Sequence, residues 1–158
     1  MMPPARARAI AERLHAGQQE PDGTPILAHI RRVARDVPAE ARAVAWLHEA
    51  LETGAISEEA LLRDGLAYEE LRALRLLSRP TTSRSDRVYM AHVELIARAA
   101  GASGHLARQV KVADLRDRQL HPMLRGDGWS PPYDRALHRI LEATADERGV
   151  IAGLSAAS

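Results

Sequence analysis

Apolar residues recur every three or four positions along most of the chain, which is the spacing of an α-helix with one buried face. Ala9, Ile10 and Leu14 share one such face, and Leu71 and Leu74 share another. No stretch of convincing length alternates between apolar and polar residues as a half-buried strand does. The pattern predicts helices over residues 5–16, 25–35, 38 to about 54, 57–63, 68–77, 86–100, 105–120 and 133 to about 148.

Glycine, proline and short polar residues mark the ends of these helices. Pro25 and Pro38 suit the first turns of the second and third helices, and Gly17 suits the end of the first. Loops are predicted over residues 18–24, 78–85, 101–104 and 121–132. These boundaries predict an all-α helical bundle of seven or eight helices, a single domain over residues 1–158. Its core spans about 5–120, and a C-terminal loop and helix follow at 121–158.

The composition supports an all-α fold and limits the kinds of partner and metal ligand that the chain is expected to use. The apolar fraction is 46% with no Phe, and a core of small aliphatic side chains favours closely packed helices. The formal net charge of +1 gives no overall drive toward nucleic acid or a membrane surface. Without cysteine, any metal must be held by histidine and carboxylate side chains. No stretch approaches the ~18 apolar residues of a membrane span, so we expect a cytoplasmic protein that does not contact membranes.

The stretch Ala45–Thr53 concentrates candidate chemistry, because an apolar run gives way there to His48, Glu49 and Glu52. On a helix, His48 and Glu52 are four residues apart and share a face. A helix edge that faces a cavity could therefore direct His48 and Glu49 toward one cation and hold Glu52 beside it. The alternative is a core histidine next to a surface glutamate.

Two further candidates, His29 and Asp114, lie in other helices with otherwise apolar faces. A buried carboxylate is costly unless a cation or several donors accompany it. Asp114 is therefore expected to have a cation, an arginine or several hydrogen-bond donors as its partner.

Four motifs, taken in order, resemble those of a known family. They are His15-x-Gly17-Gln18, Asp22-Gly23-Thr24-Pro25-Ile26-Leu27-x-His29, Leu47-His48-Glu49-x-x-Glu52 and Val110-Lys111-x-Ala113-Asp114-Leu115. Together they resemble the HD-domain phosphohydrolases, and most of all the branch that contains the (p)ppGpp hydrolase domain of RelA/SpoT proteins and its small stand-alone relatives. The resemblance covers about residues 5–120.

The resemblance implies a metal-dependent phosphohydrolase that acts on a nucleotide, (p)ppGpp-like or otherwise, or on another small phosphate ester. The divalent cation, typically manganese, would be held by His29, His48, Glu49 and Asp114. Two imidazoles and two carboxylates also suit iron or zinc, and magnesium is a further candidate.

The same resemblance implies roles for residues around the metal. Glu52 would orient or deprotonate the attacking water, and Thr53 stands at the neighbouring catalytic position. Residues that could bind phosphate oxygens, chosen from their charge alone, are Lys111, Arg84, Arg87 and Arg116.

The chain departs from the family pattern at six positions, two of which are Ile26, where the family has Tyr, and Ile30, where it has Pro. Glu49 replaces the family's Asp after the metal-binding His, and Thr53 replaces the Asp after Glu52. Glu20 replaces a basic loop residue that packs on the guanine base, and Arg118 replaces an Asn. The last two changes lie where the family binds nucleotide, so they do not favour ppGpp itself as the substrate.

Two other hypotheses compete with that of a phosphohydrolase. The first is a catalytically silent module of the same fold that binds a nucleotide or a protein partner, which the Glu49 and Thr53 changes leave open. The second is a nucleic-acid-binding helical protein, which the balanced charge disfavours. That protein would use Arg6, Arg8, Arg13, Arg31, Arg32 and Arg35.

Overall fold

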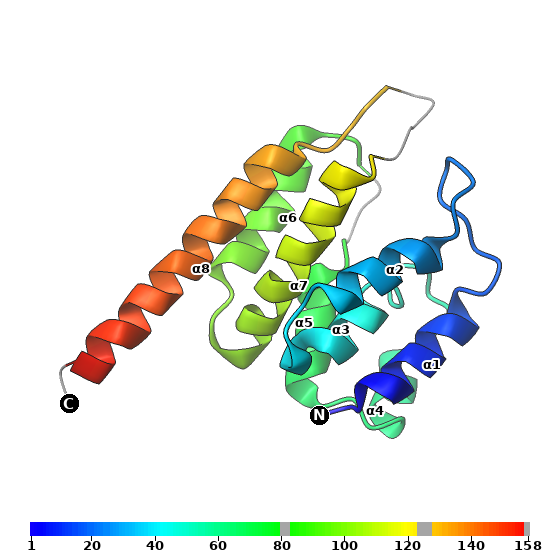
Figure 1. Cartoon of the computed structure of the whole chain (residues 1–158), viewed down its shortest axis with the longest axis horizontal. Coiled ribbons are helices and arrows are strands. Elements are labelled where there is room, and N and C mark those ends of the chain that lie inside the picture. Colours follow the sequence, from blue (N-terminus) through cyan, green and yellow to red (C-terminus); the bar gives the residue numbers. More distant parts are fainter. Residues whose placement is uncertain (80–82, 123–127, 157–158) are drawn as a thin grey trace.

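The computed structural model of the chain describes residues 1–79, 83–122 and 128–156, and the regular elements in these ranges are helices (Figure 1). They are α1 (Pro4–Leu14), α2 (Ile26–Arg35), the 3₁₀ helix η1 (Ala39–Ala41), α3 (Arg42–Leu47), α4 (Glu58–Arg63), α5 (Tyr68–Leu77), α6 (Asp86–Arg98), α7 (Gly101–Leu120) and α8 (Tyr133–Ala156). The prediction of an all-α fold with seven or eight helices is confirmed. None of the described helices has both the length and the apolar character that a membrane crossing requires.

Helix α7 is the central element, since it contacts α2, α3, α5, α6 and α8. Helices α1 to α4 lie on one side of it, and α8 runs along α6 and α7 on the other (Figure 1). Small buried residues allow this close approach, among them Ser103, Gly104 and Ala107. A Cβ atom on Gly104 would lie 1.9 Å from the carbonyl oxygen of Ala99, so the turn from α6 into α7 requires glycine there.

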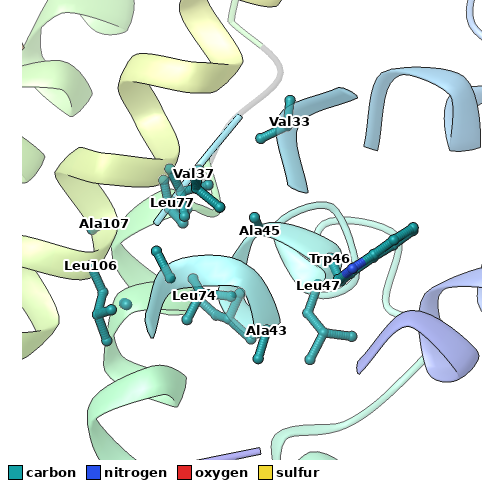
Figure 2. Packing of buried hydrophobic residues seen from close by; sticks show 14 of the residues in the cluster. Val33, Val37, Ala43, Ala45, Trp46, Leu47, Leu74, Leu77, Leu106 and Ala107 are labelled. Carbon is teal, nitrogen blue, oxygen red and sulfur yellow. The ribbon is translucent and has the colours of Figure 1, made fainter. Parts of the chain in front are cut away.

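The core between the helices consists largely of valine, leucine and alanine. Val33, Val44, Leu47 and Leu74 are fully buried, and Figure 2 shows α3 packed among α2, α5 and α7. Burial of each such leucine or valine contributes about 1.5–3 kcal/mol relative to its exposure. The apolar residues of α2, α3 and α7 thereby fix the relative positions of His29 on α2, Asp114 on α7 and the turn after α3 that holds His48 and Glu49.

Tertiary contacts explain two of the predicted boundaries that are wrong. The third helix ends at Leu47, and residues 48–53 form turns in which the amide of Ala50 donates to Leu47 O over 2.9 Å. Nδ1 of His48 donates to Ala45 O (2.7 Å), the carbonyl that would accept from residue 49 in a continued helix. The predicted loop at 101–104 is instead the first turn of α7.

The other predicted helix ends agree with the structure to within two residues, with two exceptions. Helix α8 continues to Ala156, and residues 39–41, predicted as the start of the third helix, form the 3₁₀ helix η1, so that α3 begins at Arg42. The predicted loops at 78–85 and 121–132 include residues 80–82 and 123–127, which lie outside the described residues.

Candidate metal centre

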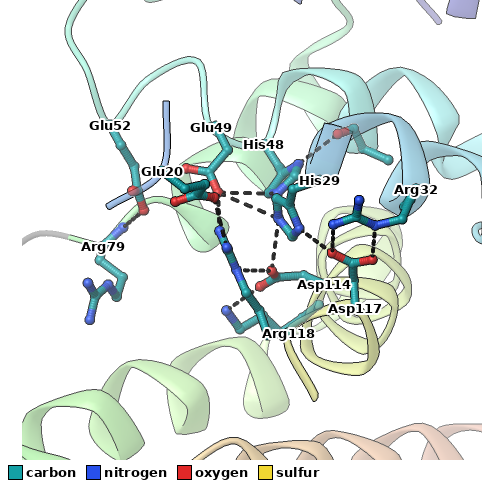
Figure 3. A network of polar contacts seen from close by, with 12 residues as sticks. Glu20, His29, Arg32, His48, Glu49, Glu52, Arg79, Asp114, Asp117 and Arg118 are labelled. Carbon is teal, nitrogen blue, oxygen red and sulfur yellow. Dashed lines mark hydrogen bonds and ion pairs between the residues drawn. The ribbon is translucent and has the colours of Figure 1, made fainter. Parts of the chain in front are cut away.

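His29, His48 and Asp114 converge from three different helical segments (Figure 3). His29 lies on the buried face of α2, His48 directly follows α3, and Asp114 lies in the middle of α7. One donor atom from each residue lies within 4.8 Å of the others. Nε2 of His29 is 3.2 Å from Nε2 of His48 and 3.3 Å from Oδ1 of Asp114. The two imidazoles are buried, so the three donor atoms face one another in the interior.

Hydrogen bonds on the far side of each ring fix which nitrogen faces the centre. Nδ1 of His29 donates to Oδ2 of Asp117 (2.7 Å), and Nδ1 of His48 donates to Ala45 O (2.7 Å). In the neutral rings both Nε2 atoms are therefore bare acceptors, and two bare acceptors cannot bond to each other. A cation between them satisfies both, so the donor set fits a divalent metal.

Glu49 lies beside these three residues, with Oε1 3.5 Å from His48 Nε2 and 3.8 Å from His29 Nε2. Burial alone would raise the pKa of Glu49, but the contacts with His48 and His29 lower it to about 2. Burial likewise opposes ionisation of Asp114, and the adjacent Lys111 holds the pKa of Asp114 well below its ordinary value. Both carboxylates are ionised at neutral pH and available as ligands.

The pKa of His29 responds to two opposed effects. Burial lowers this pKa, and the hydrogen bonds with Asp114 and Asp117 raise it by more. When His29 is protonated, its Nε2 proton faces Oδ1 of Asp114 over 3.3 Å. A bound metal replaces that proton, so the two compete for the same nitrogen.

Asp117 and Arg32 support His29 from outside the cluster. Nε and Nη2 of Arg32 donate to the two carboxylate oxygens of Asp117 over 2.6 and 3.1 Å. The pKa of Asp117 is lowered because the bonds with His29 and Arg32 outweigh its burial. Asp117 was not among the candidate residues predicted from the sequence. Its position three residues after Asp114, on the same face of α7, is the signal that could have identified it.

A cavity of about 190 Å³ opens beside the cluster. His48, Glu49 and Asp114 are among the residues that line it. The other described side chains that line it include three cations and two tyrosines, which are Arg79, Lys111, Arg118, Tyr89 and Tyr133. A small anionic molecule that enters this cavity would therefore meet both the cluster and positive charge.

Of the two residues predicted to be catalytic, Glu52 lies at the cavity and Thr53 does not. Glu52 lines the cavity, and its Oε1 accepts a hydrogen bond from the backbone amide of Arg79 (3.1 Å). Partial desolvation and the nearby Glu49 raise the pKa of Glu52. Thr53 is exposed on the turn, where its hydroxyl donates to Ala50 O, and it does not line the cavity.

Of the four residues predicted to bind phosphate, Lys111 lies at the cavity and the other three do not. Lys111 lines the cavity, and its Nζ donates to Oδ2 of Asp114 over 2.8 Å. Arg84 and Arg87 are exposed and do not line the cavity. Arg116 lines a separate cavity between α7 and α8. Charge alone did not locate Arg79, which the structure places on the wall of the site.

Most of the arginines considered for nucleic-acid binding are paired with acidic side chains. Arg6 pairs with Asp64, Arg8 and Arg31 both pair with Glu12, Arg32 pairs with Asp117 and Arg35 pairs with Asp36. These pairs reduce the positive charge that the helices could offer to a phosphate backbone.

Comparison of the chain with protein-family models and with curated proteins gave no match in either case.

Proposed function

We propose that the protein is a metal-dependent phosphohydrolase with an HD-type site, acting on a nucleotide or another small phosphate ester. The observation that carries this proposal is the buried cluster of His29, His48 and Asp114, in which the two imidazole Nε2 atoms lie 3.2 Å apart beside a cavity that His48 and Asp114 line. Nitrogen and carboxylate donors suit manganese, iron or zinc, and manganese is the first candidate.

His29, His48 and Asp114 would hold the cation, and Glu49 would complete the set from the turn after α3. A bound divalent cation supplies Lewis acidity to a phosphate oxygen and lowers the pKa of a water. Asp117 and Ala45 O keep the two rings in the orientation and tautomer that binding requires.

Glu52 is proposed as the general base. Its carboxylate lines the cavity beside Glu49, and the Arg79 amide holds one of its oxygens. The raised pKa of Glu52 brings its proton affinity closer to the value at which a base works best near neutral pH. Glu52 would take a proton from water as the water oxygen attacks phosphorus and the ester P–O bond breaks.

Arg79 and Lys111 are proposed to contact the phosphate oxygens. The guanidinium of Arg79 lies 5.7 Å from the centroid of the Tyr89 ring, and it forms no ion pair within the described parts of the chain. Lys111 is buried against Asp114 and keeps its charge, because the attraction of Asp114 raises the pKa of Lys111 despite burial. Arg79 is therefore the cation most available to an incoming anion.

The charge balance of the cavity also favours a phosphate once a metal is bound. Among the described residues that line it, the carboxylates of Glu20, Glu49, Glu52 and Asp114 outnumber Arg79, Lys111 and Arg118 by one. A divalent ion changes this net charge from −1 to +1. A phosphate dianion would then enter a site of opposite charge.

Calorimetric titration of metal-stripped protein with Mn²⁺ tests the proposal first. We expect one-to-one binding that is lost in His48→Ala and retained in His138→Ala, a matched change at a histidine that is exposed on α8. Hydrolysis of p-nitrophenyl phosphate and of a nucleotide panel would then be assayed with Mn²⁺. Absence of Mn²⁺ binding in the wild-type protein would contradict the proposal of a metal-dependent phosphohydrolase and favour a catalytically silent binding module.

A further inference from the structure

The guanidinium of Arg118 lies among three carboxylates at the cavity (Figure 3). Its Nη1 is 2.8 Å from Glu20 Oε1, its Nη2 is 3.5 Å from Glu49 Oε1, and its Nε is 3.8 Å from Asp114 Oδ1. Only 12% of the Arg118 side chain and 11% of the Glu20 side chain are exposed. The closest partner of Arg118 is thus Glu20, and its two more distant partners are candidate metal ligands.

Glu20 reaches Arg118 from the loop that joins α1 to α2. The backbone amide of Glu20 donates to Thr24 O (2.8 Å), and the amide of Gly23 donates back to Glu20 O (2.9 Å). An isolated bridge between Gln19 and Pro25 closes the base of this loop. Glu20 is therefore held by a tight turn, and its carboxylate lies across the cavity against a residue 98 positions away.

The position of Arg118 conflicts with a bound divalent cation. Its positive charge lies beside Glu49 and Asp114, the same two carboxylates that the cation would use. Two positive charges that share two carboxylates repel each other, so metal binding should weaken the hold of the cluster on Arg118. A guanidinium is also well suited to a phosphate, because its fork donates two parallel hydrogen bonds to adjacent oxygens.

We propose that Arg118 binds the substrate phosphate together with Arg79 and Lys111, and that Glu20 occupies the Arg118 guanidinium until phosphate displaces it. This inference rests on the proposed function. A carboxylate and a phosphate present similar pairs of acceptor oxygens to arginine, so Glu20 acts as an internal competitor of the substrate. Because displacement must overcome a largely buried ion pair, the site selects dianionic phosphate groups over singly charged anions.

Binding of inorganic phosphate, measured by calorimetry with one equivalent of Mn²⁺ present, tests this role. Glu20→Gln should bind phosphate about tenfold more tightly, and Arg118→Gln at least about tenfold more weakly. Arg118→Gln should also bind Mn²⁺ several-fold more tightly in the absence of phosphate. The matched control is Arg116→Gln, two positions away on α7 and outside the cavity, and it should change neither affinity.

The double variant Glu20→Gln/Arg118→Gln separates competition from a general change in charge. If Glu20 acts by occupying Arg118, the tighter binding caused by Glu20→Gln disappears when Arg118 is absent. An equal gain in both backgrounds, or wild-type phosphate affinity in Arg118→Gln, would overturn the proposal. Circular dichroism would verify that each variant is folded. If Arg118→Gln does not fold, Arg118→Lys replaces it, because lysine keeps the positive charge without the forked donors of the guanidinium.

The same experiment distinguishes failure of this inference from failure of the proposed function. Wild-type binding of Mn²⁺ with unchanged phosphate affinities in Glu20→Gln and Arg118→Gln would overturn the role of Arg118 and leave the metal site intact. Absence of Mn²⁺ binding would overturn the enzyme. Equal phosphate affinities of metal-free wild type and Arg118→Gln would then overturn the role of Arg118 as well.

Discussion

Asp117 affects the candidate metal centre through His29, since its Oδ2 accepts the Nδ1 proton of that ring (2.7 Å). Replacing Asp117 with Asn leaves the side-chain shape nearly unchanged and removes the negative charge that orients the imidazole. We expect Asp117→Asn to weaken Mn²⁺ binding about 10- to 100-fold in calorimetric titration. Asp134→Asn, at an exposed position on α8, is the control and should bind as the wild type does. Unchanged affinity in Asp117→Asn would show that Asp117 does not support His29.

His92 is a buried histidine outside the cluster, and it links stability to pH. Burial and the nearby charge of Lys111 lower its pKa from 6.5 to about 4, while its Nε2 proton is donated to Leu76 O (2.8 Å). Between these two pH values the unfolded chain binds a proton at His92 that the folded chain does not. The contribution of His92 to stability is therefore complete above pH 6.5 and is lost as pH falls toward 4.

Urea unfolding at several pH values between 7.5 and 4.5 would measure this linkage. We expect the wild type to lose more of its free energy of unfolding over this interval than His92→Gln does. The comparison uses the difference between the two proteins, since every other titrating group is shared by both. Parallel pH profiles would mean that His92 titrates alike in the folded and unfolded chains.

At the scale of the element, periodicity was sufficient for most helices because the apolar faces are continuous. It failed where one contact decides a boundary. The helix that contains Trp46 ends at Leu47 because the ring of His48 bonds to Ala45 O. The glycines at 101 and 104 are typical of a loop, yet one begins α7 and the other allows α6 and α7 to meet. Such effects depend on neighbours that a local pattern does not include.

Substitution of Gly104 tests whether the close approach of α6 and α7 requires glycine at this turn. Gly104→Ala should destabilise the fold by about 1–3 kcal/mol or more, because the new Cβ would overlap the carbonyl of Ala99. Gly149→Ala is a matched control inside α8, where nothing lies within 4 Å of the added atom. That substitution should instead raise stability by about 0.5–1 kcal/mol, since alanine favours a helix interior over glycine. Thermal unfolding of the two variants would measure both effects, and equal shifts would contradict the packing argument.

At the scale of the whole molecule, the sequence indicated the candidate ligands but not their partners. His29, His48 and Asp114 were identifiable because each interrupts an apolar face. The pairs His29 with Asp117 and Glu20 with Arg118 join residues 88 and 98 positions apart. Only the packing of α2 and the α1–α2 loop against α7 brings these residues together. From the sequence alone, Glu20 and Arg118 could therefore be recognised only as departures from a family pattern.

A metal held by residues of α2, α7 and the turn after α3 should stabilise the fold as a whole, because the unfolded chain does not keep these ligands together. Mn²⁺ at 100 times its dissociation constant should add about 2.7 kcal/mol to the free energy of unfolding. For a chain of this length that corresponds to a rise in Tm of roughly 5–10 °C.

Thermal unfolding with and without Mn²⁺ would measure this rise in wild type, His48→Ala and His138→Ala. The rise in Tm should be present in wild type and His138→Ala and absent in His48→Ala, since His48→Ala is the variant that lacks a metal ligand. An equal rise in all three proteins would mean that Mn²⁺ stabilises the chain at some other place, and the cluster of His29, His48 and Asp114 would then not be the metal centre.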